Sequence, residues 1–248
     1  FVRFFKKMQR FFFDNEQILD NKFSVSGEKF NHIIRSLRMS VGETVVFCDG
    51  DFDYDCRLLS LDASRASFEI TDKYINNTEP QLKITVFQCI TKGEKMDDMV
   101  RRCVQFGVYK IIPVLSRRCV SRPDVKAAEK KIDRLNKIAR SSAMQSMRGY
   151  IPKVTELIDF EAALKQMSEF EHRFICYENE RNKLPLIPPA GAGELAFLIG
   201  PEGGLDDAEI ALASDIGIEC VSLGRRILRT EDAASFLIPV LLFNTENL

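Results

Sequence analysis

The distribution of apolar and polar residues divides the chain into two parts of different character. Up to about residue 75, short apolar stretches alternate with turn-forming residues, which is typical of β-strands. Apolar residues at helical spacing predict one helix among them, over about 26–39. The first part is therefore expected to be a small, mostly β module. Its strands are predicted at 10–13, 44–48, 54–61 and 66–70.

From residue 82 onward, apolar runs alternate with amphipathic helical stretches. This alternation is typical of an α/β fold with a parallel sheet covered by helices on both faces. A polar, turn-rich stretch at 76–80 separates the two parts, so we expect two domains, 1–79 and 80–248. In the second, strands are predicted at 82–90, 108–115, 172–177, 194–200 and 219–223, and helices around 96–103, 124–147, 206–214 and 230–243.

Composition narrows the class of protein. The chain has 248 residues, of which 45% are hydrophobic and 29% are charged, as in ordinary globular proteins. No apolar run approaches the roughly 18 residues that a membrane span needs, so a soluble protein without a membrane partner is expected. The seven cysteines contain no C-x-x-C pair, which argues against a disulfide framework or a metal site and favours the reducing cytoplasm.

The first residues do not resemble a secretion signal. A basic, aromatic stretch precedes Met8, and its apolar part is too short for the core of a signal peptide. We expect Met8 to be the natural start.

A net charge of −1 conceals an uneven distribution. Residues 1–79 carry a net −2, residues 80–150 a net +10 and residues 151–248 a net −9. The basic stretch could be no more than solvated helix faces, or it could be the electrostatic footprint of a nucleic-acid backbone.

Two loops carry the most distinctive chemistry, and both follow predicted strands. Ligands of open α/β sheets bind beyond the carboxyl ends of the strands. The strand at 194–200 runs into GPEGG (200–204), where glycines let the backbone approach a ligand closely. The alternative is a plain tight turn followed by a helix capped by Asp206. The strand at 219–223 runs into GRRILRTED (224–232), with three arginines ahead of a helix that Thr230 could cap.

Commoner catalytic motifs do not fit. The G-x-G-x-x-A match at 191–196 precedes a strand, whereas a dinucleotide fingerprint follows one. The chain has no P-loop and no G-x-S-x-G motif. His32 and His172, the only histidines, have no nucleophile signature near them and are expected to be structural.

Taken together in order, seven segments resemble the bacterial 16S ribosomal RNA methyltransferases that modify uridine N3, which belong to the knotted SPOUT class. The resemblance extends over nearly the whole chain. Its most specific parts are GPEGGLDDAEI and SLGRRILRTEDA. The segments lie at 8–13, 32–43, 92–100, 106–118, 143–154, 200–210 and 222–233.

This resemblance implies an N-terminal PUA-like β-barrel that binds RNA and a C-terminal SPOUT domain with a trefoil knot. It also implies S-adenosylmethionine as the methyl donor, a homodimer, and 16S ribosomal RNA or the assembled small ribosomal subunit as partner. The implied cofactor-binding residues are Tyr177, Glu178, Leu198, Ile199, Gly200, Pro201, Glu202, Gly203, Gly204, Leu223, Gly224, Ile227, Leu228 and Arg229.

The expected reaction needs a methyl group aligned with uridine N3 and a route for the N3 proton. Arg229 is predicted to stabilise negative charge on the uracil carbonyls, and Glu231 to orient Arg229 or to take the proton. Two alternatives stay open: a related knotted methyltransferase acting on another ribosomal or transfer RNA position, and a non-catalytic RNA-binding assembly protein. Predicted RNA contacts are Arg10, Arg38, Lys92, Arg117, Arg118 and Arg148.

Overall fold

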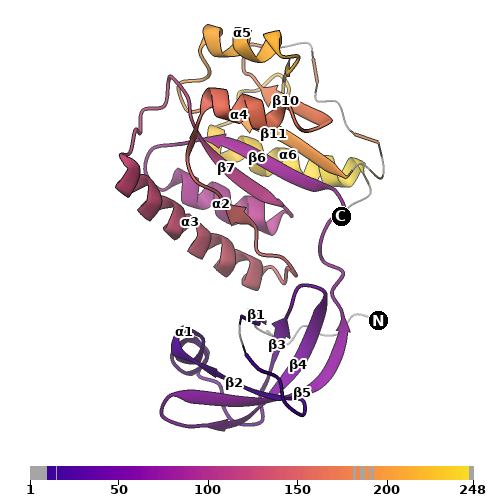
Figure 1. Cartoon of the computed structure of the whole chain (residues 1–248). Helices are drawn as coiled ribbons and strands as arrows, with labels where there is room; N and C mark the ends of the chain where they lie inside the picture. Colours follow the sequence, from indigo (N-terminus) through magenta and orange to yellow (C-terminus); the bar gives the residue numbers. More distant parts are fainter. Residues whose placement is uncertain are drawn as a thin grey trace. The chain divides into compact units, whose positions relative to one another are not determined.

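The computed structural model describes residues 10–14, 16–180, 183–184, 188–189, 191 and 193–245 (Figure 1). The expected start at Met8 lies outside these residues. The chain forms two compact units. The first comprises the chain up to Glu79 together with Met144–Tyr150, and the second comprises Pro80–Ala143 and the chain from Ile151 onward.

The first unit is built on a curled five-stranded sheet with the order β1-β3-β4-β5-β2. Its pairs are antiparallel except for β1 with β3. Phenylalanines from four of the strands stack in its core, where Phe47 lies between Phe11 and Phe23. The strands are β1 (Arg10–Phe12), β2 (Lys22–Ser26), β3 (Thr44–Cys48), β4 (Phe52–Leu61) and β5 (Arg65–Ile75).

The helix predicted over 26–39 has two parts. α1 (Gly27–Asn31) continues directly as a π-helix, η1 (His32–Leu37), and Arg38 ends it in a left-handed conformation with φ of 52°. Ile33, which is fully buried, anchors the π-helical turn to the core. β2 was not predicted, because its alternating exposed and buried residues include only two apolar ones, Phe23 and Val25.

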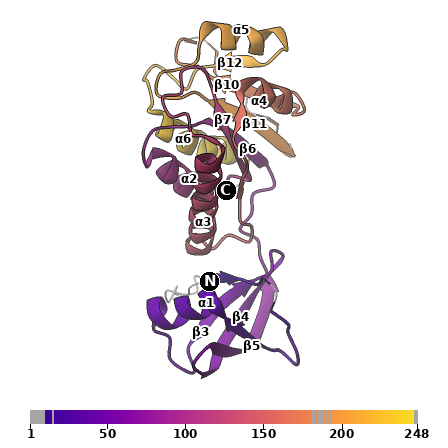
Figure 2. The ribbon, with the colours of Figure 1, turned by 60° about the vertical axis from the view of Figure 1, so that its left-hand side comes forward.

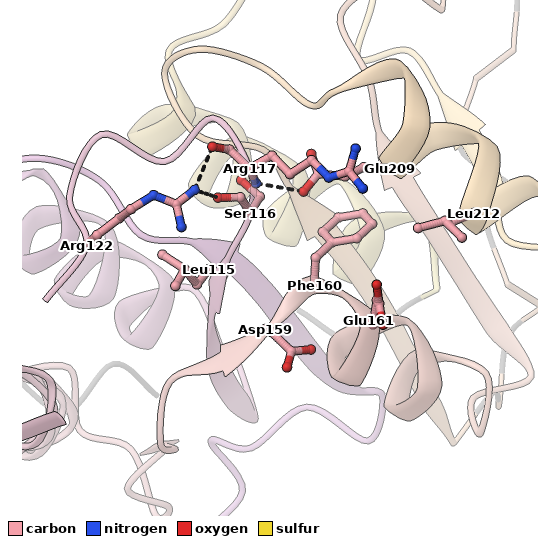
Figure 3. Close-up of a pocket in the computed structure, with 9 residues that line it drawn as sticks. All are labelled: Leu115, Ser116, Arg117, Arg122, Asp159, Phe160, Glu161, Glu209 and Leu212. Atoms are coloured by element: carbon pink, nitrogen blue, oxygen red, sulfur yellow. Dashed lines mark hydrogen bonds between the residues drawn. The ribbon is translucent and has the colours of Figure 1, made fainter. Parts of the chain in front are cut away.

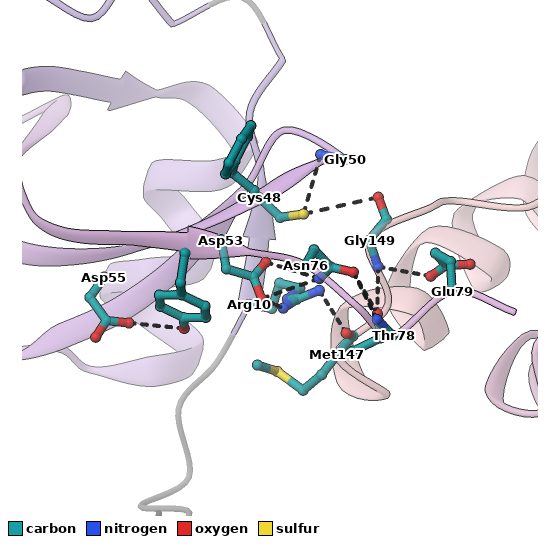
Figure 4. A network of polar contacts seen from close by, with 12 residues as sticks. Arg10, Cys48, Gly50, Asp53, Asp55, Asn76, Thr78, Glu79, Met147 and Gly149 are labelled. Carbon is teal, nitrogen blue, oxygen red and sulfur yellow. Dashed lines mark hydrogen bonds and ion pairs between the residues drawn. The ribbon is translucent and has the colours of Figure 1, made fainter. Parts of the chain in front are cut away.

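The segment 144–150 belongs to the first unit although it follows a helix of the second (Figure 4). The Glu79 carboxylate accepts hydrogen bonds from the backbone amides of Gly149, at 2.9 Å, and Tyr150, at 3.2 Å, and it pairs with the Arg148 guanidinium. Arg10 donates to the carbonyl oxygen of Met147 at 2.6 Å. The segment is therefore fixed to the sheet by buried and half-buried polar contacts.

The second unit contains a seven-stranded sheet in which every pair is parallel. This confirms the α/β class. The order is β12-β10-β11-β6-β7-β8, with β9 also paired to β7. The strands are β6 (Lys83–Cys89), β7 (Lys110–Leu115), β8 (Lys153–Val154), β9 (Ile158–Asp159), β10 (His172–Cys176), β11 (Glu194–Ile199) and β12 (Glu219–Val221).

Helices cover both faces of this sheet (Figures 1 and 2). α4 (Phe160–Met167) and α5 (Asp207–Asp215) pack against the face that carries Phe87 and Leu198. On the opposite face, α2 (Lys95–Gln105) and α6 (Thr230–Asn244) contact each other, and α6 also contacts β6 and β11. The long α3 (Val125–Gln145) lies beside α2. No helix in the described ranges combines the length and apolar character needed to cross a bilayer.

Candidate active site

Because the strands of the second unit are parallel, the loops that leave them meet at one edge of the sheet. β11 leads into the glycine loop (200–204), and β12 leads into the arginine loop (222–229). β6 leads into a third segment, the lysine turn (91–95), and β7 into a fourth, the arginine turn (116–118). The two loops that stand out in the sequence therefore lie at the same edge of the sheet, on either side of the end of β10.

A buried chain of hydrogen bonds joins the glycine loop to the start of α6. The Thr230 hydroxyl donates to the carbonyl oxygen of Gly200 at 2.5 Å and accepts from the Gln88 side-chain amide at 3.0 Å. Gln88 is fully buried. Thr230 does not cap α6, since the cap position belongs to Arg229 and its side chain makes no capping bond. Its hydroxyl instead fixes the direction of the Gly200 carbonyl.

The lysine turn holds one side of the glycine loop through Glu202. The Lys92 amide and the Lys95 ammonium each donate to Glu202 Oε1 at 3.2 Å. Partial burial raises the pKa of the Glu202 carboxyl, but the amide hydrogen bonds and the Lys95 ion pair outweigh it, so the pKa lies below its ordinary value. A carboxyl with a lowered pKa is ionised at neutral pH, so this contact is complete there and weakens only as the pH falls into the acidic range.

The arginine turn holds the other side. Arg118 donates to the Gly203 carbonyl at 3.5 Å and to Asp206 at 3.4 Å. Asp206 also caps α5 in a reciprocal capping box with Glu209. The helix cap expected from the alternative interpretation is thus present, and it directs the glycine loop into α5 alongside the contacts from the arginine turn.

The segment after β10 forms a further wall. Glu178 places its carboxylate where a side chain at Gly204 would have to sit. Tyr177 donates from its hydroxyl to Asp207 at 3.3 Å, and its amide donates to the Val221 carbonyl at 2.9 Å. The structure therefore brings Tyr177 and Glu178 beside both predicted loops.

The arginine loop offers open backbone and one exposed apolar side chain. Gly224 has φ of 107°, and a Cβ there would meet no atom within 4 Å. Ile227 is 85% exposed, which is unusual for isoleucine, while Leu223 and Leu228 are half-buried. Apolar side chains beside an uncrowded glycine suit a flat heteroaromatic ring.

Charged groups of opposite sign lie at the end of this loop. Arg229 is exposed, and its guanidinium has no ion-pair partner among the described residues. Glu231 is 9% exposed, and within the described ranges its Oε2 has no hydrogen-bond partner. The nearest cation to that oxygen is Lys95, whose Nζ lies 3.8 Å away. A cation and a carboxylate with unused bonding capacity thus flank the open loop.

Comparison with known proteins shows the family to which this fold belongs. The family model described as an RNA methyltransferase domain matches residues 77–242, and that of an RNA methyltransferase PUA domain matches residues 25–71. The chain belongs to this RNA methyltransferase family. The curled sheet of the first unit is therefore PUA-like, and the parallel sheet of the second carries the methyltransferase domain.

Similar proteins match this methyltransferase along almost their full length. Ribosomal RNA small subunit methyltransferase E of Bacillus subtilis is 32% identical, with 96% of this chain and 98% of the relative covered. A crystal structure of ribosomal RNA small subunit methyltransferase E from Neisseria gonorrhoeae bound to S-adenosyl methionine has a TM-score of 0.82 at 31% identity, covering 96% and 98% of the two chains. A putative methyltransferase from Legionella pneumophila in complex with the same cofactor has a TM-score of 0.86 at 27% identity, with 96% and 98% covered.

Some predicted site residues of the methyltransferase lie elsewhere than expected. Leu198 and Ile199 are 0% and 3% exposed, with Leu198 in the core beneath α4 and α5, so their side chains cannot pack against a ligand. Only their backbone borders the glycine loop. Pro201 is also buried. The apolar contacts available to a ligand come instead from Leu223, Ile227 and Leu228.

Two of the predicted RNA contacts are structural. Arg10 is 1% exposed and is paired with Asp53, and Arg148 is 4% exposed and is paired with Glu79. Their guanidinium groups are buried in ion pairs inside the first unit, so neither can hold a phosphate. The other predicted RNA contacts, at the end of η1 and in the lysine and arginine turns, are exposed: Arg38, Lys92, Arg117 and Arg118.

A pocket of about 310 Å³ lies behind the arginine turn (Figure 3). Glu209 and Phe160 line it together with Arg122, which donates to the Ser116 and Arg117 carbonyls at 3.1 and 2.6 Å. The Arg117 amide donates to Glu209 at 2.8 Å. These polar groups are occupied in shaping the turn, and the pocket includes no residue of the glycine or arginine loops.

Three residues that organise the methyltransferase site were not assigned these contacts from sequence. Gln88 is a polar residue within the apolar run 82–90, which was the available signal. Thr230 was considered only as a helix cap. Lys95 was counted as one basic residue among many, and only the fold shows that it lies between Glu202 and Glu231.

Replacing Gly204 by alanine should weaken cofactor binding by tenfold or more. Gly204 has φ of 69°, so alanine costs about 1–2 kcal/mol in backbone strain, and its Cβ would also displace the Glu178 carboxylate. Gly217→Ala is the matched control, since Gly217 has φ of 71° but open space around it. Thermal unfolding should show a similar loss of stability in both variants. Calorimetric titration with S-adenosylmethionine should show a loss of affinity only in Gly204→Ala. Equal cofactor affinity in both would contradict the assignment of the glycine loop.

Proposed function

We propose that this chain transfers a methyl group from S-adenosylmethionine to N3 of a uridine in small-subunit ribosomal RNA. The observation that carries the proposal is the joining of the glycine loop to the start of α6, which places Arg229 and Glu231 beside the predicted cofactor loops. The names of the similar proteins support ribosomal RNA of the small subunit as the substrate and S-adenosylmethionine as the donor.

The residues present fit this cofactor. Adenine would pack on Ile227 and Leu228, and backbone groups of the glycine and arginine loops would bind its polar edge. Gly203 lets the arginine turn pack closely on the glycine loop, because a Cβ there would press on the Arg118 carbonyl at 3.3 Å. When bound, the cofactor would supply a methyl carbon that the positively charged sulfur activates toward uracil N3.

The protein has to bind the base, align N3 and manage charge. Removing the N3 proton puts negative charge on the uracil carbonyl oxygens, and the exposed Arg229 guanidinium would stabilise it by donating charge-assisted hydrogen bonds to one of them. Glu231 would accept the proton on its carboxylate, whose Oε2 is buried without a hydrogen-bond partner among the described residues, so that the other oxygen would meet the base. Arg229 is the N-cap residue of α6 and Glu231 lies in its first turn, so the start of this helix keeps the two side chains close together.

RNA would be held by exposed basic side chains around the site. Lys92, Arg117 and Arg118 flank the glycine loop, and α3 adds further exposed lysines, including Lys130 and Lys137. The PUA-like unit would add Arg38, whose left-handed backbone fixes the exposed end of η1. Contacts to phosphates bind any sequence, so the target uridine must be selected by RNA shape and by the base pocket.

We also infer a homodimer. Phe236, Val240 and Phe243 recur at helical spacing on α6 and are 49%, 36% and 70% exposed. An exposed apolar stripe on the helix that carries Arg229 and Glu231 would be covered by a second copy. The trefoil knot remains a prediction from the family resemblance. We place the reaction in the cytoplasm, where ribosomal RNA is assembled into subunits.

Nucleotide mapping of small-subunit RNA from a deletion strain tests the proposal. We expect one N3-methyluridine to disappear and to return when the wild-type gene is supplied, but not when Glu231→Gln is supplied. An unchanged N3-methyluridine pattern with a missing modification elsewhere would establish the related-methyltransferase alternative. An unchanged pattern throughout, without cofactor binding by the protein, would leave an RNA-binding assembly role.

Salt should separate the two kinds of binding. The calculation takes one phosphate contact for each of four exposed residues, Arg38, Lys92, Arg117 and Arg118. The logarithm of the RNA association constant should then fall against the logarithm of the salt concentration with a slope of about −3. A fourfold rise in salt should therefore weaken RNA binding about 50-fold. Cofactor affinity, which rests on backbone and apolar contacts, should change less than about twofold. Filter binding and calorimetry at 50 and 200 mM salt measure both. Equal slopes for the two ligands would refute this division of the surface.

A further inference from the structure

One ammonium group lies between the glycine loop and the start of α6. Lys95 Nζ is 3.2 Å from Glu202 Oε1 and 3.8 Å from Glu231 Oε2. The lysine turn reinforces the first contact, since the Lys92 amide donates to the same Glu202 oxygen at 3.2 Å. A segment that follows β6 therefore connects a residue of the predicted cofactor site with the proposed proton acceptor.

The two contacts of Lys95 differ in kind. Glu202 receives a direct hydrogen bond, whereas Glu231 lies beyond hydrogen-bond distance and is attracted by charge alone. A buried acceptor without a partner costs about 1–3 kcal/mol, and more when it is charged. Glu231 Oε2 is such an acceptor among the described residues. Lys95 thus balances the charge of this buried oxygen and leaves the other carboxylate oxygen to take the proton.

Lys95 also keeps the two carboxylates compatible. Both lie within 4 Å of the same nitrogen, so without the ammonium they would repel each other across the site. Each could relieve the repulsion by turning its side chain away. For Glu202 this would loosen the glycine loop, and for Glu231 it would move the acceptor oxygen.

We propose that Lys95 is a positioning residue that holds the Glu231 carboxylate ready for the uracil N3 proton and ties that position to the glycine loop through Glu202. This inference rests on the proposed function. In the step, the N3–H bond breaks and its proton passes to the Glu231 carboxylate. The N3 electron pair forms the bond to the methyl carbon as the carbon–sulfur bond breaks, and its electrons remain on sulfur, which becomes neutral. Glu231 afterwards releases the proton to water.

A double-mutant cycle tests the inference. Methyl transfer is measured at saturating cofactor on small-subunit RNA with Lys95→Met, Lys95→Arg, Glu231→Gln and the double variant Lys95→Met with Glu231→Gln. Lys165→Met, at an exposed position of α4 on the other face of the sheet, controls for loss of a lysine. Thermal unfolding of every variant identifies any that fails to fold.

We expect Lys95→Met to lower kcat roughly 10- to 100-fold, the cost of a misplaced acceptor, while KM for the cofactor rises by a smaller factor because Glu202 in the glycine loop loses its Lys95 contact. Lys95→Arg should recover most of kcat. The double variant should be no slower than Glu231→Gln alone, because Lys95 acts through Glu231. Multiplying effects in the double variant, or a loss confined to cofactor KM, would overturn the inference. If Lys95→Met does not fold, the Lys95→Arg rate decides, and a rate as low as that of Glu231→Gln overturns it.

Failure of the proposed chemistry, in which Glu231 takes the proton, gives a different pattern of rates. If Glu231→Gln keeps the full rate, Glu231 is not the proton acceptor, and the proposed chemistry and the role of Lys95 fall together. If Glu231→Gln is slow and Lys95→Met is as fast as Lys165→Met, the proposed function stands and only the role of Lys95 is refuted.

Discussion

Replacing Arg229 by alanine is expected to slow methyl transfer by two to three orders of magnitude, the usual effect of removing one donor that stabilises developing negative charge. Arg229 is exposed at the start of α6, so the substitution removes no packing and should leave stability unchanged. Single-turnover transfer to small-subunit RNA at saturating cofactor isolates the chemical step. The loss should appear in this rate and far less in cofactor affinity.

Arg225→Ala serves as the matched comparison, since Arg225 is an exposed arginine of the same loop and its loss changes the net charge equally. We expect it to reduce the rate less than tenfold. Arg229→Lys should fall between the two, because a lysine keeps the charge but not the planar pair of donors. If Arg229→Ala methylates RNA at the wild-type rate, the catalytic assignment of this residue is wrong.

Replacing Arg10 by alanine is expected to lower the free energy of unfolding of the first unit by about 3–5 kcal/mol. Asp53, its partner, is 4% exposed and would keep hydrogen bonds from the Asn76 amide, at 3.1 and 3.2 Å, but no ion pair. A domain is typically stable by only 5–15 kcal/mol, so this is a large fraction. Hydrogen exchange of the β4 and β5 amides, measured at increasing urea concentrations, would report the stability of the first unit separately from that of the second.

The exposed pair of Arg57 with Glu69, at 2.6 Å, supplies the control. Arg57→Ala should cost less than about 1 kcal/mol because water screens this pair. Arg10→Met combined with Asp53→Leu should recover much of the stability, since it removes both buried charges. Equal, small losses for Arg10→Ala and Arg57→Ala would show that the buried pair is not what holds the first unit together.

Local patterns predicted the elements whose signal is strong. The strand at Thr44–Cys48 and the helices at Lys95–Gln105 and Thr230–Asn244 agree closely with the apolar periodicity. α4 was not predicted, although Asp159 caps it and Phe160, Ala163 and Met167 follow at helical spacing. That signal was present, but the helix is only eight residues long, and it starts directly after a strand of two.

The sequence predicted one part of the candidate site and missed another. The glycine and arginine loops were recognisable because glycine and arginine clusters directly after strands are uncommon. The roles of Gln88 and Lys95 were not, since each depends on contacts with residues more than 100 positions away. Counting basic residues also overestimated the RNA surface, because composition does not distinguish Arg148, which is buried, from Arg118, which is exposed.

The return of Met144–Tyr150 to the first unit has a consequence for how this protein is made. The chain passes between the two units three times, so the first unit does not consist of one continuous piece of chain. On the ribosome, Glu79 emerges 71 residues before Tyr150, its last partner. At about 5–20 residues per second, that is a wait of roughly 4 to 14 s, during which Glu79 and the buried Arg10 lack their contacts to this segment. A nascent chain that stalls in this window would expose an incomplete sheet with unpaired polar groups to chaperones and proteases.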